Sequence, residues 1–273
     1  MVSGARDERE ERILAVAADL LVRHGYRRTT VDEVAARAGV GKGTVYLHWS
    51  SRDELFRAAI GREMAATIGD LAETVRSDPG AWRPHRIAHR YALAVLGRPL
   101  LAAVILADQD VLGGLALPPD DPRIATHQPA VTAYFAALGR HGALREGWEP
   151  TEAAFAFAAT LEGFLRAVGP SALATGPASP PAAVRGRVAE LLATVVRHAF
   201  EPPRHPDAVL AVVPAQDREA RIRADVLASL SALAHPTPTS PRDHAIRDDH
   251  AIRNGGTARA SICRRDGDPP TGP

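Results

Sequence analysis

The chain has 273 residues, of which 45% are hydrophobic and 24% are charged, as in an ordinary soluble globular protein. The formal net charge is only +1, so composition gives no argument for nucleic-acid binding and any basic surface must be local. The single cysteine, Cys263, excludes an intramolecular disulfide and a zinc site made of several cysteines.

The amino-terminal residues are charged and lack the apolar core of a signal peptide, so residues 1–8 are expected to form a solvated arm. No uninterrupted apolar run reaches the roughly 18 residues of a membrane span. We therefore expect a cytoplasmic protein with no membrane partner.

The first two predicted helices are short and well delimited. The first covers residues 10–24 and closes at Gly25. Thr30 and Glu33 then form a capping box, in which the threonine hydroxyl caps the start of the second helix. Gly39 ends this second helix, as glycine does just after a helix carboxyl terminus. Its apolar face lies at i, i+3, i+4 and i+7, at Val31, Val34, Ala35 and Ala38.

A short third helix follows residues 41–43, where two glycines leave the start of the helix almost without side chains. Its pattern directs Val45 and Trp49 inward. Two short helices joined by a glycine-containing turn are typical of a helix-turn-helix, whose second helix enters the DNA major groove. The residues expected to point outward are Thr44, Tyr46 and His48.

The rest of the chain also predicts helices. A serine pair followed by acids at 50–54 indicates a helix start, and apolar residues keep helical spacing to about Val75. Downstream we find no convincing strand alternation, and Pro- and Gly-rich breakers separate the segments. The expected helices are 82–97, 99–112, 122–140, 151–168 and 181–200.

From Glu201 onward prolines recur, and one further helix fits residues 216–234. The segment after His235 cannot bury enough apolar area to offset its ordering entropy, so we expect disorder there. The expected fold is all-α. Its parts are a helix-turn-helix domain at 9–60, a larger helical domain at 61–200 and an extension at 201–273.

Three motifs stand in order near the amino terminus: TT-V-x-E-V-A from Thr29, A-G-V-x-K-G-T-V-Y-x-H-W from Ala38, and S-x-x-E-L-F from Ser51. Together they resemble the TetR family of transcriptional regulators over residues 9–60. The resemblance implies a ligand-responsive repressor that binds an inverted-repeat DNA operator as a homodimer. Gly41 departs from the family, where a small polar residue is common, and offers no side chain to a base.

The resemblance and the helix ends together indicate the DNA-contacting residues. Backbone N–H groups near Thr30 and Lys42 can point at phosphates. The Lys42 ammonium can donate to guanine O6 and N7, and the Leu47 side chain can pack on a thymine methyl. The alternatives are that Tyr46 and His48 belong to the core, that Arg52 is a solvated charge, and that Lys42 touches only phosphate. The predicted set is Thr30, Gly41, Lys42, Gly43, Thr44, Tyr46, Leu47, His48 and Arg52.

The larger domain is expected to hold a small-molecule inducer and the dimer interface. Aromatic residues with polar tips are candidates to line the ligand pocket, although each of them alternatively belongs to the core. The last two helices of the domain resemble the pair through which the family dimerises, although their apolar faces alternatively form monomer core. The candidate ligand residues are Trp82, His89, Tyr91, Tyr134, Phe135 and Trp148. The candidate interface residues are Phe157, Leu161, Phe164, Val188, Leu192 and Val195.

The sequence also bears on two other classes of function. An enzyme is disfavoured, because the sequence has no Gly-rich phosphate loop, no G-x-S-x-G and no H-E-x-x-H. A ligand sensor that no longer binds DNA remains an alternative. His85 and His89 stand four residues apart, but no carboxylate or cysteine pattern completes a metal site, so no metal or cofactor is expected.

Overall fold

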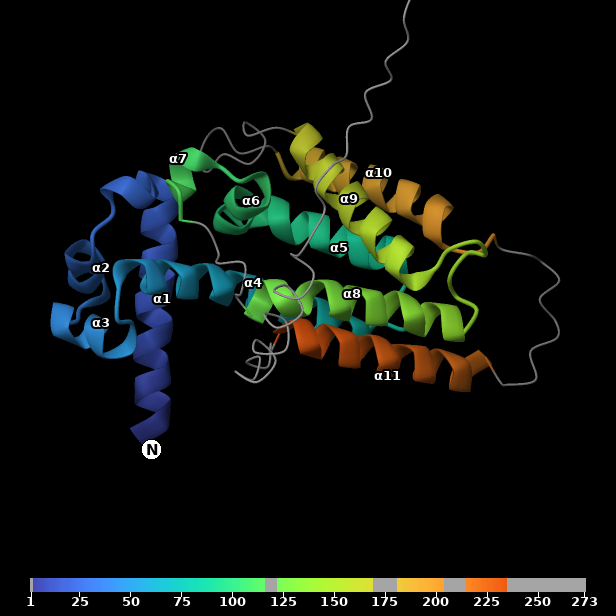
Figure 1. The fold of residues 1–273 in the computed structure, drawn as a ribbon, viewed down its shortest axis with the longest axis horizontal. Helices are drawn as coiled ribbons and strands as arrows, with labels where there is room; N and C mark the ends of the chain where they lie inside the picture. Colours follow the sequence, from blue (N-terminus) through green and yellow to red (C-terminus); the bar gives the residue numbers. More distant parts are fainter. Residues whose placement is uncertain (1, 116–121, 169–180, 204–214, 235–273) are drawn as a thin grey trace, which may run out of the picture. The chain divides into compact units, whose positions relative to one another are not determined.

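The computed structural model describes residues 2–115, 122–168, 181–203 and 215–234. All regular secondary structure in these ranges is helical, which confirms the all-α prediction (Figure 1). The expected disorder after residue 235 concerns a segment outside the described residues. The helices are α1 (Val2–Arg28), α2 (Val31–Ala38), α3 (Lys42–His48), α4 (Arg52–Ser77), α5 (Pro84–Gly97), α6 (Pro99–Leu106), α7 (Gln109–Leu112), α8 (Pro122–Arg140), α9 (Pro150–Val168), α10 (Ala182–Phe200) and α11 (Ala215–Ala234).

The amino-terminal helices enclose one apolar core. Ile13 of α1, Val34 of α2, Val45 of α3 and Phe56 of α4 are all at most 1% exposed and belong to the same cluster. The segment 1–8, expected as a solvated arm, is helical from Val2, although residues 7–9 are exposed. Ala5, Arg6 and Glu8 are good helix formers, so the segment can continue the helix without an apolar face.

The larger domain has its own core, drawn from α4, α5, α8, α9, α10 and α11. Helix α10 packs on α5, and α11 packs on α4 and α8 (Figure 1). Helix α11 lies beyond residue 200, where the second domain was predicted to end. The domain core therefore extends into α11 through three buried residues, Ile222, Val226 and Leu230.

The segment 99–112 is two helices rather than the single one predicted. Ala107 has a left-handed backbone (φ 53°) that ends α6, and the Asp108 side chain caps α7 by accepting from two backbone N–H groups. This break turns α7 onto α1, and Leu100 and Leu112 pack into the core of the amino-terminal domain. Helices α6 and α7 therefore join the two domains.

Within the described residues, no single helix has both the length and the apolarity of a membrane span. Helices α5 and α6 pass the same test only when taken together, and they meet at a bend of 106°.

Candidate nucleic-acid interface and ligand cavity

The two ends of α2 carry the threonine cap and the glycine that the sequence indicated, while the Glu33 carboxylate pairs with Arg37 at 3.2 Å. The Thr30 hydroxyl accepts a hydrogen bond from the Glu33 backbone N–H at 3.2 Å, which satisfies one unpaired donor of α2. Gly39 adopts the left-handed conformation (φ 69°), and its N–H bonds back to carbonyls of the last turn. Trp49 and Val45 are buried as predicted, so α3 has a defined outer face.

The outer face of α3 carries two exposed large apolar side chains. Leu47 is 83% exposed and Tyr46 is 45% exposed, and the backbone of residues 41–43 is open to solvent. A lone exposed leucine is common on protein surfaces. Here it adjoins a tyrosine and a nearly bare helix start, an arrangement that suits contact with thymine methyls and phosphates.

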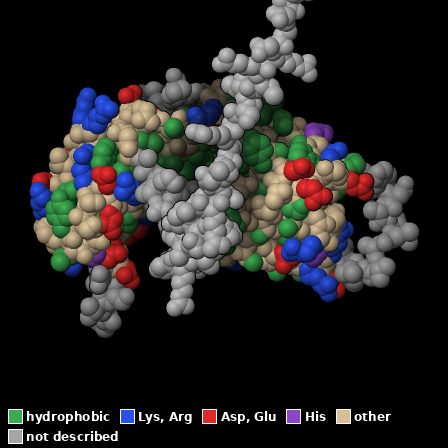
Figure 2. Space-filling view, in the orientation of Figure 1, with side chains coloured by type: hydrophobic (Ala, Val, Ile, Leu, Met, Phe, Trp, Pro, Cys, Tyr) green, Lys and Arg blue, Asp and Glu red, His purple; other side chains and the backbone are tan. Residues whose placement is uncertain are grey.

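Lys42, the only lysine of the chain, is paired with an acid of the preceding helix. Its Nζ lies 2.8 Å from the Asp32 carboxylate, and this hydrogen bond raises the pKa of the Lys42 ammonium. Figure 2 shows basic and acidic side chains interspersed over the end of the molecule that holds α2 and α3. On this face of the molecule the surface around α2 and α3 is therefore of mixed charge.

Two predicted phosphate ligands have partners inside the domain. The His48 side chain is only 8% exposed and its Nδ1 lies 2.6 Å from Glu10 of α1, so the prediction that it points outward is wrong. Arg52 donates to the Thr29 carbonyl at 3.0 Å and to the Tyr26 carbonyl, with its guanidinium stacked on the Tyr26 ring. Both side chains fasten neighbouring helices, a role that one-dimensional patterns do not reveal.

Residues 13–59 match the family model described as bacterial regulatory proteins, tetR family. The amino-terminal domain therefore belongs to the TetR family. The family is one of regulatory proteins rather than enzymes, in agreement with the expectation from the sequence.

Two curated relatives match this chain over the amino-terminal region. The transcriptional activator FasR of Mycolicibacterium smegmatis is 36% identical over 72 residues, 26% of this chain and 33% of FasR. The DNA-binding transcriptional repressor TetR of Mycobacteroides abscessus is 41% identical over 71 residues, 26% of this chain and 37% of that protein. This chain thus spans about a third of the length of these relatives.

A solved structure extends the likeness to the larger domain. A TetR-family regulator from Pectobacterium atrosepticum is 21% identical, with a TM-score of 0.51 over 74% of this chain and 98% of that chain. At this identity the match shows a common fold and nothing about ligand or operator.

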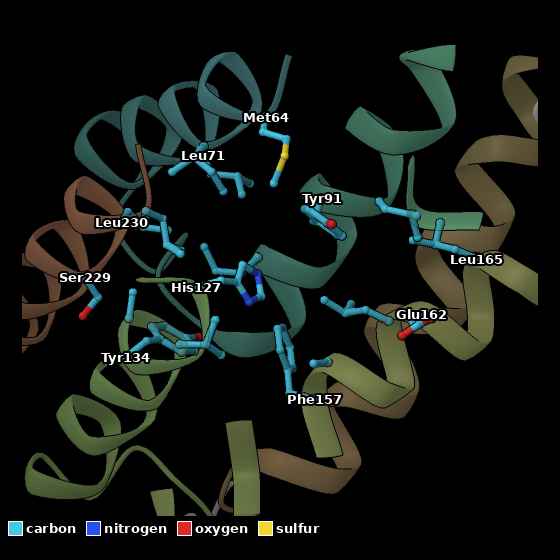
Figure 3. A pocket seen from close by; sticks show the side chains of 18 residues that line it. Met64, Leu71, Tyr91, His127, Tyr134, Phe157, Glu162, Leu165, Ser229 and Leu230 are labelled. Atoms are coloured by element: carbon cyan, nitrogen blue, oxygen red, sulfur yellow. The ribbon is translucent and has the colours of Figure 1, made fainter. Parts of the chain in front are cut away.

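The larger domain contains an apolar cavity of about 340 Å³ (Figure 3). Six helices contribute to its wall: α4, α5, α6, α8, α9 and α11. Of the predicted ligand residues, Tyr91 and Tyr134 line it. His127 and Leu230 also line it, and the sequence analysis missed both. Their helical segments alone gave no indication that α8 and α11 would meet at one cavity.

The other four predicted ligand residues lie outside this cavity. Phe135 is completely buried in the core, and Trp82 is 4% exposed with its carbonyl accepting from Tyr134. Trp148 donates to the Ala199 carbonyl at 2.9 Å. His89 lines a separate polar groove between α5 and α10, where desolvation and the neighbouring Arg90 lower the pKa of its imidazole. Among the described residues no group of three metal-ligating side chains occurs.

Most of the residues predicted for the dimer interface pack inside the single chain. Phe157 and Leu192 are buried in the core of the larger domain, and Leu161 lines the cavity. Phe164 and Val188 pack partly buried against the apolar clusters. The large apolar side chains that α9 and α10 do expose are Phe155 at 71%, Val184 at 45%, Leu191 at 45% and Val195 at 44%. Only Val195 belongs to the predicted set.

Proposed function

We propose that this chain is a transcriptional regulator that reads duplex DNA with the outer face of α3. The observation that carries the proposal is the pairing of a buried Val45 with an exposed Tyr46 and Leu47, on a helix fronted by two glycines. Backbone N–H groups at the start of α3 and α2 would hold phosphates, while Leu47 and Thr44 meet thymine methyls. Lys42 would exchange Asp32 for guanine or phosphate.

The operator is proposed to be an inverted repeat bound by a homodimer, with the two copies of α3 about one helical turn of DNA apart. The exposed apolar residues of α9 and α10 support this association. Four large apolar side chains are exposed on these two helices, and their burial against a second copy would be favourable.

The chain is further proposed to respond to a small molecule by releasing its operator, as a repressor. Ile105 of α6 lines the cavity, while Leu100 of the same helix packs in the core of the DNA-binding domain. Helix α7, which follows, lies against α1, where the Asp110 carbonyl closely approaches Gly25. A ligand that favours one position of α6 would therefore bias the position of α1 to α3.

Selection of random duplexes by the purified chain tests the DNA-binding proposal. We expect enrichment of an inverted repeat. Leu47→Ala and Lys42→Ala should weaken binding by about 1–3 kcal/mol each. Phe155→Ala, which removes another exposed apolar side chain, should not change affinity for a half-site duplex. Helical circular dichroism should be unchanged in all three variants.

A ligand sensor without DNA binding is the second candidate. The Asp32–Lys42 pair and the absent side chain at Gly41 favour it, since both weaken the interface. Failure to enrich any duplex, with a folded and ligand-binding protein, would select this candidate over the first.

A further inference from the structure

The cavity described above presents little charge. Its described lining contains no lysine and no arginine, and most of it is aliphatic or aromatic. Figure 3 shows Met64, Leu71, Phe157 and Leu230 around its centre. The polar side chains of the described wall are Tyr91, His127, Tyr134, Glu162 and Ser229.

Three of these polar side chains are already engaged within the protein. The Tyr134 hydroxyl donates to the Trp82 carbonyl at 2.9 Å, and the Ser229 hydroxyl donates to the Asp225 carbonyl at 3.1 Å. Glu162 accepts from the Arg166 guanidinium at 2.7 and 2.9 Å, which neutralises the only carboxylate of the described wall.

The two remaining side chains make no hydrogen bond among the described residues. Tyr91 of α5 and His127 of α8 both line the cavity in Figure 3. Burial, with a smaller contribution from the Glu162 charge, raises the pKa of Tyr91 to about 12, so its hydroxyl stays a donor. Desolvation lowers the pKa of His127, so at pH 8 its imidazole is uncharged.

We propose that the cavity selects an uncharged, largely apolar molecule with a carbonyl-type acceptor for the Tyr91 hydroxyl, and rejects the carboxylate of equal chain length. A carboxylate would lose its hydration without meeting a cation, and it would also approach Glu162. An ammonium ligand would also bind poorly, because Glu162, the carboxylate of the described wall, is already paired with Arg166. The volume of about 340 Å³ suits a small ligand of this kind.

Three probes of similar tail length test the charge selection: 2-decanone, n-nonanoate and n-nonylammonium. Binding to the full chain is measured by isothermal titration calorimetry at pH 8 without DNA. We expect the ketone to bind at least about ten-fold more tightly than either ion. Equal or tighter binding of an ion, or no binding of the ketone, would overturn the inference.

Two matched variants test the hydrogen bond from the Tyr91 hydroxyl to the ketone oxygen. Tyr91→Phe should weaken ketone binding about three- to ten-fold. Tyr134→Phe makes the same change in the same cavity, but its hydroxyl already serves Trp82, so ketone affinity should change less than two-fold. Thermal unfolding scans establish that both variants are folded. An unchanged affinity of Tyr91→Phe contradicts the assigned hydrogen bond.

The inference rests on the proposed function, because only a regulator would respond to the ligand. The experiments distinguish failure of the ligand class from failure of the DNA-binding proposal. If the ketone binds but no duplex is enriched, the proposal that the chain regulates transcription by binding DNA is wrong, and the proposed ligand class stands. If a duplex is enriched but the ion binds best, the ligand class is wrong and the regulator stands.

Discussion

Glu201 accepts two hydrogen bonds from His85, one from the ring Nδ1 at 2.6 Å and one from the backbone N–H at 3.0 Å. An ionised carboxylate only accepts, so Nδ1 carries the proton in this pair. Both side chains are 10% exposed. The pair joins the start of α5 to the residue that follows α10, and so closes one end of the larger domain.

Replacing Glu201 with Gln should lower the free energy of unfolding by about 1–3 kcal/mol at pH 7, because a buried charge-assisted pair is lost. Urea denaturation measures the change. Glu73→Gln removes a carboxylate that is paired with Arg76 but 69% exposed, and it should have little effect.

The same pair predicts a dependence of stability on pH. Burial opposes ionisation of Glu201, but the hydrogen bonds from His85 outweigh it and hold the pKa of the carboxyl below its ordinary value. This stabilisation is complete above the unfolded pKa of about 4.3 and is lost as pH falls through the lowered folded pKa. The difference between wild type and Glu201→Gln should therefore shrink in acid. A difference that stays constant from pH 7 to pH 3 contradicts this account.

Gly25 and Gly39 allow a matched test of the joint between the domains. Both have a left-handed φ, 71° and 69°. A Cβ on Gly25 would lie 2.2 Å from the Asp110 carbonyl oxygen, whereas a Cβ on Gly39 would meet nothing within 4 Å. Gly39→Ala should cost about 1 kcal/mol. Gly25→Ala should cost about 1–3 kcal/mol more, through overpacking and because its backbone (ψ 161°, against 35° at Gly39) is nearly confined to glycine. Equal losses in urea unfolding would show that α7 does not press on α1.

Asp32→Asn should tighten DNA binding several-fold at low salt. The change removes a negative charge beside the phosphates and releases Lys42 from its partner. The gain should fade as salt rises, because exposed charges are screened. Gel shifts at two salt concentrations measure it, with Glu73→Gln as the distant control. A weaker complex would mean that Asp32 positions Lys42 for its DNA contact.

Leu191→Glu should convert the proposed dimer into a monomer. It places a charge on the exposed apolar surface of α10, where the symmetry mate would bury it. Thr194→Glu adds the same charge on the side of α10 that faces the groove with α5, and should leave the dimer intact. Sedimentation velocity gives the mass of each. A wild type that sediments as a monomer would remove the dimer from the proposal.

Local patterns predicted most of the helices, because caps, breakers and apolar spacing are read from neighbouring residues. They were less successful where a helix has several apolar sides. Leu192 and Leu191 are adjacent in α10, yet one is buried and the other is 45% exposed. Periodicity alone could not assign one to the core and the other to the surface, since both fit an apolar stripe.

By itself, the sequence determined an all-α chain with a TetR-type helix-turn-helix, because those motifs depend on short-range hydrogen bonds and backbone conformation. Only the tertiary structure decided that His48 and Arg52 turn to partners inside the domain. It also decided that α11 completes the wall of a largely apolar cavity. These features arise from side chains that meet across long separations, where hydration and competing partners, rather than local spacing, determine the contact.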